Sequence, residues 1–139
     1  MPGHLGGIMK LHHVGLVVRS VSIANELCQE RLKDDAPLVW EPVPAFQCFC
    51  AFSVKFPMIE FIVPEAESKL VKFFGGRSVL HHIAFAVENI RHPTPFSVGD
   101  FIFDEPAPAL RGLLVNFLKP LGGLLVELVQ EPKKAEGRG

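Results

Sequence analysis

Residues 11–18 read LHHVGLVV and residues 80–87 read LHHIAFAV, so one eight-residue pattern occurs twice along the chain. A second pattern follows each copy. MIEFIVPE begins at residue 58 and LVELVQEP at residue 125, and each places one glutamate inside a run of strand-forming residues. A histidine-bearing strand is therefore followed by a glutamate-bearing strand in both halves. This repeat predicts two homologous modules.

Periodicity and chain breakers assign the elements of the first module. Residues 11–18 are expected to form a strand. Ser20 or Ser22 can cap a helix that runs through about Leu32. Its buried face is expected to carry Val21, Ala24, Leu27 and Cys28. Two or three strands are expected next, around residues 38–43, 47–55 and 58–63, which makes the module βαβββ.

The second module repeats the strands but not the helix. A short amphipathic helix over residues 65–75 is expected to connect the modules. Pro93 and Pro95 then forbid more than about one turn of helix in the second module. Its strands are expected at 80–87, about 99–103, 112–118 and 123–130.

The domain division follows from these elements. We expect one domain over residues 10–131, with modules at about 10–64 and 80–131 joined by a connector at 65–79. Residues 1–9 are interpreted as an N-terminal extension or a tag remnant, and the polar residues 132–139 as a frayed tail.

Composition and charge exclude several classes of function. The chain has 139 residues, 48% hydrophobic and 21% charged, which is typical of one soluble globular domain. With a net charge of −1, the chain has no excess of positive charge that would attract a polyanion, so nucleic acid is not an expected partner. No uncharged apolar run reaches the roughly 18 residues of a membrane span. The start, MPGHLGGIMK, lacks the apolar core of a signal peptide, and three cysteines form no disulfide framework, so we expect a cytoplasmic protein.

Strand alternation separates the two histidines of each pair, because neighbouring side chains point to opposite faces of a sheet. His13 shares its face with Gly15, whereas His12 shares its face with bulky aliphatic residues. In the second strand, His82 lies with two alanines. His13 and His82 are therefore expected to line a hollow. The other two, His12 and His81, are expected to be packed or hydrogen-bonded.

Two glutamates lie in the middle of apolar strands, at Glu60 and Glu127. A buried carboxylate without a partner costs several kcal/mol or shifts its pKa until it is neutral, so both need compensation. Two imidazoles and two carboxylates, one of each from each module, suit Zn, Ni, Co, Mn or Fe(II). The sequence therefore predicts one divalent ion per site, and its expected ligands are His13, Glu60, His82 and Glu127.

The same segments resemble the vicinal oxygen chelate superfamily, which includes glyoxalase I, methylmalonyl-CoA epimerase and the extradiol dioxygenases. HHVGLVV, IEFIVP, LHHIAFAV and GGLLVELVQ carry the resemblance, which covers about residues 10–131. The epimerase branch is the most similar, through PEAESKLVKFF leading to LHHIAFAVENI and through VNFLKPLGGLLVELVQ.

This resemblance implies an α+β fold of eight mixed strands curved into a cup around the ion. It also implies a homodimer and a metal-dependent isomerase or epimerase that stabilises an enolate of an acyl-CoA-like or other dioxygenated small molecule. Glu127 matches the position that serves as both ligand and proton-transfer residue. The epimerase branch has a second catalytic glutamate in an EQG-like segment. Pro44-Ala45-Phe46 stands there, so that base is absent.

Two other functions stay open at this point. A glyoxalase I-type lactoylglutathione lyase would use the same two histidines and two glutamates. A non-catalytic small-molecule-binding protein would share the fold and usually dispense with the metal. An extradiol dioxygenase is least favoured, because those enzymes use two histidines and one carboxylate on Fe(II) and are usually longer.

Overall fold

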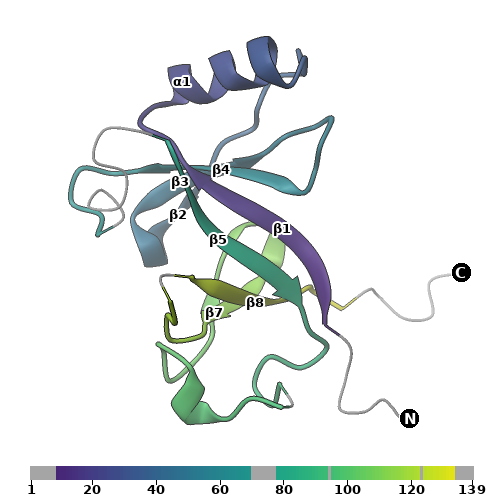
Figure 1. Ribbon diagram of the computed structural model, residues 1–139, viewed down its shortest axis with the longest axis vertical. Helices are drawn as coiled ribbons and strands as arrows, with labels where there is room; N and C mark the ends of the chain where they lie inside the picture. Colours follow the sequence, from purple (N-terminus) through teal and green to yellow (C-terminus); the bar gives the residue numbers. More distant parts are fainter. Residues whose placement is uncertain (1–8, 70–77, 94, 123, 134–139) are drawn as a thin grey trace, which may run out of the picture.

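The computed structural model describes residues 9–69, 78–93, 95–122 and 124–133. Its strands, in chain order, are β1 (Lys10–Val17), β2 (Glu41–Val43), β3 (Cys48–Phe52), β4 (Ile59–Pro64), β5 (Val79–Ala86), β6 (Ala107–Pro108), β7 (Leu114–Phe117) and β8 (Val126–Gln130). They form one mixed sheet in the order β2-β3-β4-β1-β5-β8-β7-β6. The sheet curves into a cup (Figure 1), as the glyoxalase-like fold predicts.

The two halves of the sheet meet at β1 and β5, which pair antiparallel. β4 lies parallel to β1 on one side of this seam, and β8 lies parallel to β5 on the other. The histidine-bearing and glutamate-bearing strands of both modules are thus the four central strands of the sheet. The repeat seen in the sequence is a repeat of the fold.

Among the described residues, one α-helix occurs: α1 (Val21–Glu26), which continues as a π-helix, η1 (Leu27–Arg31). Ser20 is its N-cap, since the Ser20 hydroxyl accepts a hydrogen bond from the Ile23 N–H at 3.1 Å. Ala24 and Cys28 are buried as predicted, against the outer face of β1 and β4. Val21 was expected to be buried but is 41% exposed, and Ile23 packs against this cluster instead.

No α-helix occurs in the described residues between β5 and β6; the helical segment there is one 3-10 turn, Val98–Asp100. This agrees with the shortened second-module helix. The prediction of a strand at 99–103 was wrong. Ser97 and Asp100 form a capping box, and the chain makes a 3-10 turn there instead of a strand. Loop residues Ile90 and Phe101 pack on the outer face of the second module in place of a helix.

Other expectations fall partly or wholly outside the described residues. Residues 65–69 of the expected connector form turns rather than a helix, and residues 70–75 are not described. The N-terminal extension and the tail also lie almost entirely outside the described residues. Among the described residues, no helix has the length and apolarity that a membrane crossing requires.

Successive side chains of β4 point alternately to the hydrophobic cluster beneath α1 and to the interior of the cup. Phe61 is fully buried beneath α1, in a cluster with Val18, Ala24 and Cys28. Glu60 and Ile62, its neighbours on the strand, point to the other face. Packing under α1 therefore fixes which side of β4 faces the cup.

We expect Phe61→Ala to lower the free energy of unfolding by about 3 to 5 kcal/mol, because it leaves a cavity in this cluster. Phe49→Ala on β3 is the matched control, since Phe49 is 39% exposed, and it should cost less than about 1 kcal/mol. Urea unfolding followed by circular dichroism measures both. Equal losses in the two variants would contradict this assignment of the core.

Candidate metal centre

Four buried side chains from the four central strands converge inside the cup: His13 from β1, Glu60 from β4, His82 from β5 and Glu127 from β8. The Nε2 atoms of the two histidines lie 3.1 Å apart. Oε1 of Glu127 lies 3.2 Å from each of them, and Oε1 of Glu60 lies 3.3 and 3.4 Å from them. The residues singled out in the sequence therefore meet at one point.

Small residues in the sheet register make room for these four side chains. His13 lies opposite Ala84 across the β1–β5 seam, and His82 lies opposite Gly15. A Cβ atom on Gly15 would approach Cε1 of His82 to 2.2 Å, far inside contact distance. Gly15 is therefore required by the imidazole that occupies the space next to it.

Opposite charges compensate one another within the cluster. Burial by itself would raise the pKa of the Glu60 carboxyl, but hydrogen bonds and charges from His13 and His82 outweigh it and lower this pKa to about 2. Burial likewise would lower the pKa of His82, but Glu127 and Glu60 raise it to about 10. Against the effect of burial, the charge of His82 lowers the pKa of Glu127, and the neighbouring carboxylates of Glu127 and Glu60 raise the pKa of His13.

One carboxylate oxygen remains without a hydrogen bond. Oε1 of Glu127 is buried and lies close to both Nε2 atoms, yet it has no hydrogen-bond partner among the described residues. A buried oxygen of this kind needs a partner, and a cation at the point of convergence would supply one.

The donor atoms fit a divalent ion. Neighbouring ligands held about 2.0 to 2.2 Å from an ion lie roughly 2.8 to 3.6 Å from one another at tetrahedral or octahedral angles. The separations given above fall in this range. One donor atom each from His13, Glu60 and His82 also lies within 4.8 Å of the others. Two nitrogens and two carboxylate oxygens suit Zn, Ni, Co, Mn or Fe(II).

The remaining histidine of each pair touches the ring that follows it. Nδ1 of His12 lies 2.7 Å from Nδ1 of His13, and Nδ1 of His81 lies 2.8 Å from Nδ1 of His82. The expectation that His12 and His81 are hydrogen-bonded is confirmed. Burial, followed by the charge of His82, lowers the pKa of His81 to about 4, so His81 is neutral at pH 7.

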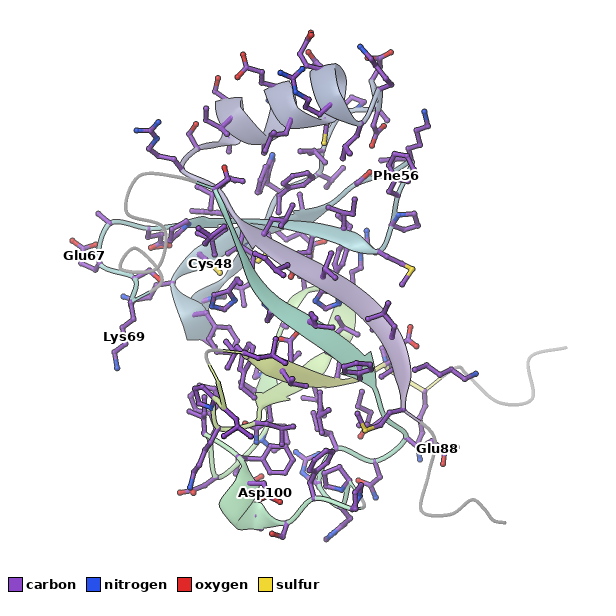
Figure 2. The ribbon with its side chains drawn as sticks, viewed as in Figure 1. Cys48, Phe56, Glu67, Lys69, Glu88 and Asp100 are labelled. Atoms are coloured by element: carbon purple, nitrogen blue, oxygen red, sulfur yellow. The ribbon has the colours of Figure 1, made fainter. Side chains whose placement is uncertain are left out.

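A cavity of about 430 Å³ opens onto the cluster, and Glu60, His82 and Glu127 form part of its wall. Much of the wall is apolar, and Phe46 packs there against Phe103 and Phe117 with ring centroids 5.9 and 5.8 Å apart. Cys48 and Lys69 also line it, on the same side of the molecule in Figure 2.

The cavity wall includes residues to which the sequence assigns no role. His81 was expected to be packed or hydrogen-bonded, and no local pattern marks His81 or Phe103 as a cavity residue. Pro44–Phe46 forms a 3-10 turn, so an aromatic ring reaches the cavity from the segment where the epimerase branch has its second glutamate.

No family model matches the chain, and no curated protein matches it by sequence. Several solved structures do match the structure of this chain. A hypothetical protein of Bacillus halodurans is 30% identical and has a TM-score of 0.74, covering 93% of this chain and 99% of its own. Methylmalonyl-CoA epimerase of Mycobacterium tuberculosis is 22% identical, with a TM-score of 0.75 and 89% of each chain covered. A variant epimerase of Streptomyces coelicolor, in complex with 2-nitronate-propionyl-CoA, is 19% identical, with a TM-score of 0.74, covering 91% of this chain and 99% of that one.

The duplicated sheet, the convergent residues and these matches agree with the resemblance drawn from the sequence. The chain has the fold of the methylmalonyl-CoA epimerases, which agrees with its resemblance to the vicinal oxygen chelate superfamily.

We expect Gly15→Ala to weaken zinc binding at least about tenfold, because the added methyl group displaces the His82 ring. Gly99→Ala is the matched control, since nothing lies within 4 Å of the new Cβ. Competition with a chromophoric chelator measures the affinity, and circular dichroism checks the fold. Equal affinity in the two variants would show that His82 does not need this space.

The metal-free protein should lose stability as the pH rises above 6.5. His82 has a folded-state pKa of about 10 against an ordinary value of 6.5, so its contribution is complete below pH 6.5 and is lost as the pH rises through about 10. Glu60 contributes above pH 4.5 and loses its contribution as the pH falls through about 2. Melting temperatures of chelator-treated protein across this range measure the effect. A melting temperature that rises between pH 6.5 and 10 would contradict the cluster's charge state.

Proposed function

We propose that this protein is a divalent-metal-dependent isomerase or epimerase of the vicinal oxygen chelate type. Its substrate would be an acyl-CoA-like or other small molecule with two neighbouring oxygens. The observation that carries the proposal is the convergence of His13, Glu60, His82 and Glu127 at one point, where the last three of them line a cavity. The resemblance to epimerases supports the reaction class and a homodimer, which we also propose. We propose a cytoplasmic location from the N-terminal sequence and the three cysteines without a disulfide framework.

The four residues would have different tasks. When bound, the ion supplies a Lewis acid for two substrate oxygens and stabilises negative charge that develops on them. His13, His82 and Glu60 would hold it in place. Glu127 would hold it and also move the proton on the carbon next to the carbonyl, because its carboxylate reaches the cavity wall and its Oε1 lacks a hydrogen bond.

Besides Glu127, the described part of the cavity wall has one other carboxylate that could accept this proton. Among the described residues of this wall, the carboxylates are Glu60 and Glu127, both in the cluster. Pro44 stands where the resemblance to the epimerase branch implies a second base, and its side chain cannot accept a proton. We therefore expect the proton to leave and return through Glu127, with isotope exchange at the carbon faster than inversion of its configuration.

The wall also indicates the shape of the substrate. Phe46, Phe103 and Phe117 would contact an apolar group next to the reacting carbon. Lys69 is exposed and lines the same cavity, where its ammonium group could pair with an anionic part of the substrate. An acyl thioester with a charged carrier meets both requirements, and a structural neighbour holds such a ligand, 2-nitronate-propionyl-CoA.

The decisive experiment is exchange of the α-proton in deuterated water, with protein loaded in turn with Zn, Ni, Co, Mn or Fe(II) and methylmalonyl-CoA as the probe. We expect exchange by the wild type and a loss of about 100- to 10,000-fold in Glu127→Gln. Glu88→Gln, at an exposed residue outside the cavity, is the control and should exchange normally. An unchanged rate in Glu127→Gln would remove Glu127 from the reaction.

A glyoxalase I-type lyase is the second candidate, because it needs the same two histidines and two glutamates and is compatible with one proton-transfer carboxylate. Incubation with methylglyoxal and glutathione, followed by the absorbance of the thioester product, separates the two reactions. A protein that binds the metal stoichiometrically but is inactive in both assays would contradict both catalytic proposals and favour a binding protein.

A further inference from the structure

The seam between β1 and β5 contains two irregularities, and both fall on histidines. The antiparallel register between these strands shifts twice. One shift follows Leu11 and leaves His12 as the extra residue of β1. The other follows Gly15 and leaves His81 as the extra residue of β5. Each histidine that precedes a residue of the metal centre thus lies at a β-bulge.

The bulges change where these two side chains point. In a regular strand, neighbouring side chains lie on opposite faces and their rings do not meet. A bulge re-aims the extra residue. Here the Nδ1 atoms of His12 and His13 come to 2.7 Å, and those of His81 and His82 to 2.8 Å. The same contact is made in both halves of a duplicated sheet.

Counting protons assigns a direction to these hydrogen bonds. A neutral imidazole has one N–H and one acceptor nitrogen. A ring that offers Nε2 to a cation must carry its proton on Nδ1, so His13 and His82 are the donors. His12 and His81 are then the acceptors, and their own protons lie on Nε2. For His12 this places the N–H toward a carboxylate, since Nε2 lies 3.8 Å from Oε2 of Glu131.

We propose that His12 and His81 are positioning residues for the metal centre. Each accepts the Nδ1–H of the histidine that follows it and so holds the Nε2 lone pair of that ring toward the point where the four side chains meet. The proposal rests on the proposed metal centre. Partners of this kind change metal affinity by 10- to 100-fold in known sites.

Two substitutions of His81 separate hydrogen bonding from packing. Asparagine retains an acceptor close to the position of Nδ1, whereas leucine fills similar space without one. We expect His81→Leu to bind zinc 10- to 100-fold more weakly than the wild type, and His81→Asn to recover most of this loss. His92→Leu is the control, because His92 is exposed and lies outside the cavity. Chelator competition measures the affinity. Unchanged affinity in His81→Leu, or equal losses with leucine and asparagine, would overturn the proposal.

The wild-type protein provides a test that does not depend on the folding of any variant. Nitrogen-15 spectra of the zinc-loaded protein report which ring nitrogen carries each proton. We expect Nδ1–H and zinc-bound Nε2 in His13 and His82, and Nε2–H in His12 and His81. Zinc on Nδ1, or a proton on Nδ1 of His12 and His81, would overturn this inference alone. A wild type that binds no divalent metal would overturn the metal centre and, with it, this inference.

Discussion

Two imidazoles and two carboxylates are buried at one point of the sheet, where the two histidine Nε2 atoms lie 3.1 Å apart and each lies 3.2 to 3.4 Å from a carboxylate oxygen of Glu60 and of Glu127. Buried charges are costly unless they are paired, so the surrounding structure has to keep all four side chains in mutual contact. Gly15 leaves space for one ring, and Ala84 lies opposite the other. Oε1 of Glu127 has no hydrogen bond among the described residues, and the proposed cation would be its partner.

Duplication explains why the site lies at the centre of the sheet. Each module supplies one histidine and one glutamate on neighbouring parallel strands. Neither module has the complete donor set, and the antiparallel seam between β1 and β5 joins the two half sets. The contacts that hold the two modules together are therefore the same contacts that align the site, and disturbance of one disturbs the other.

The four side chains of the proposed metal centre and the residues of the cavity wall would determine different parts of the reaction. The four side chains are those that the resemblance to the epimerase branch implies as metal ligands, but Phe46 reaches the cavity from the segment where the same resemblance implies a second base. In the proposed reaction, metal binding and substrate activation would depend on the strands of the sheet, whereas the path of the proton and the fit of the substrate would depend on the loops. Loops change more easily than paired strands, so a single donor set can serve reactions with different stereochemistry.

The sequence by itself determined the duplication, the main strands and the four convergent residues. Alternation of side chains along a strand, and the free-energy cost of a carboxylate buried in an apolar strand, can both be recognised within a short segment of sequence. It was wrong where a local turn competed with strand propensity, as at Ser97 and Asp100. Only the tertiary structure decided that His12 and His81 lie beside their neighbours. Alternation assumes a regular ladder, and a bulge arises from the register between two strands that lie far apart in the chain.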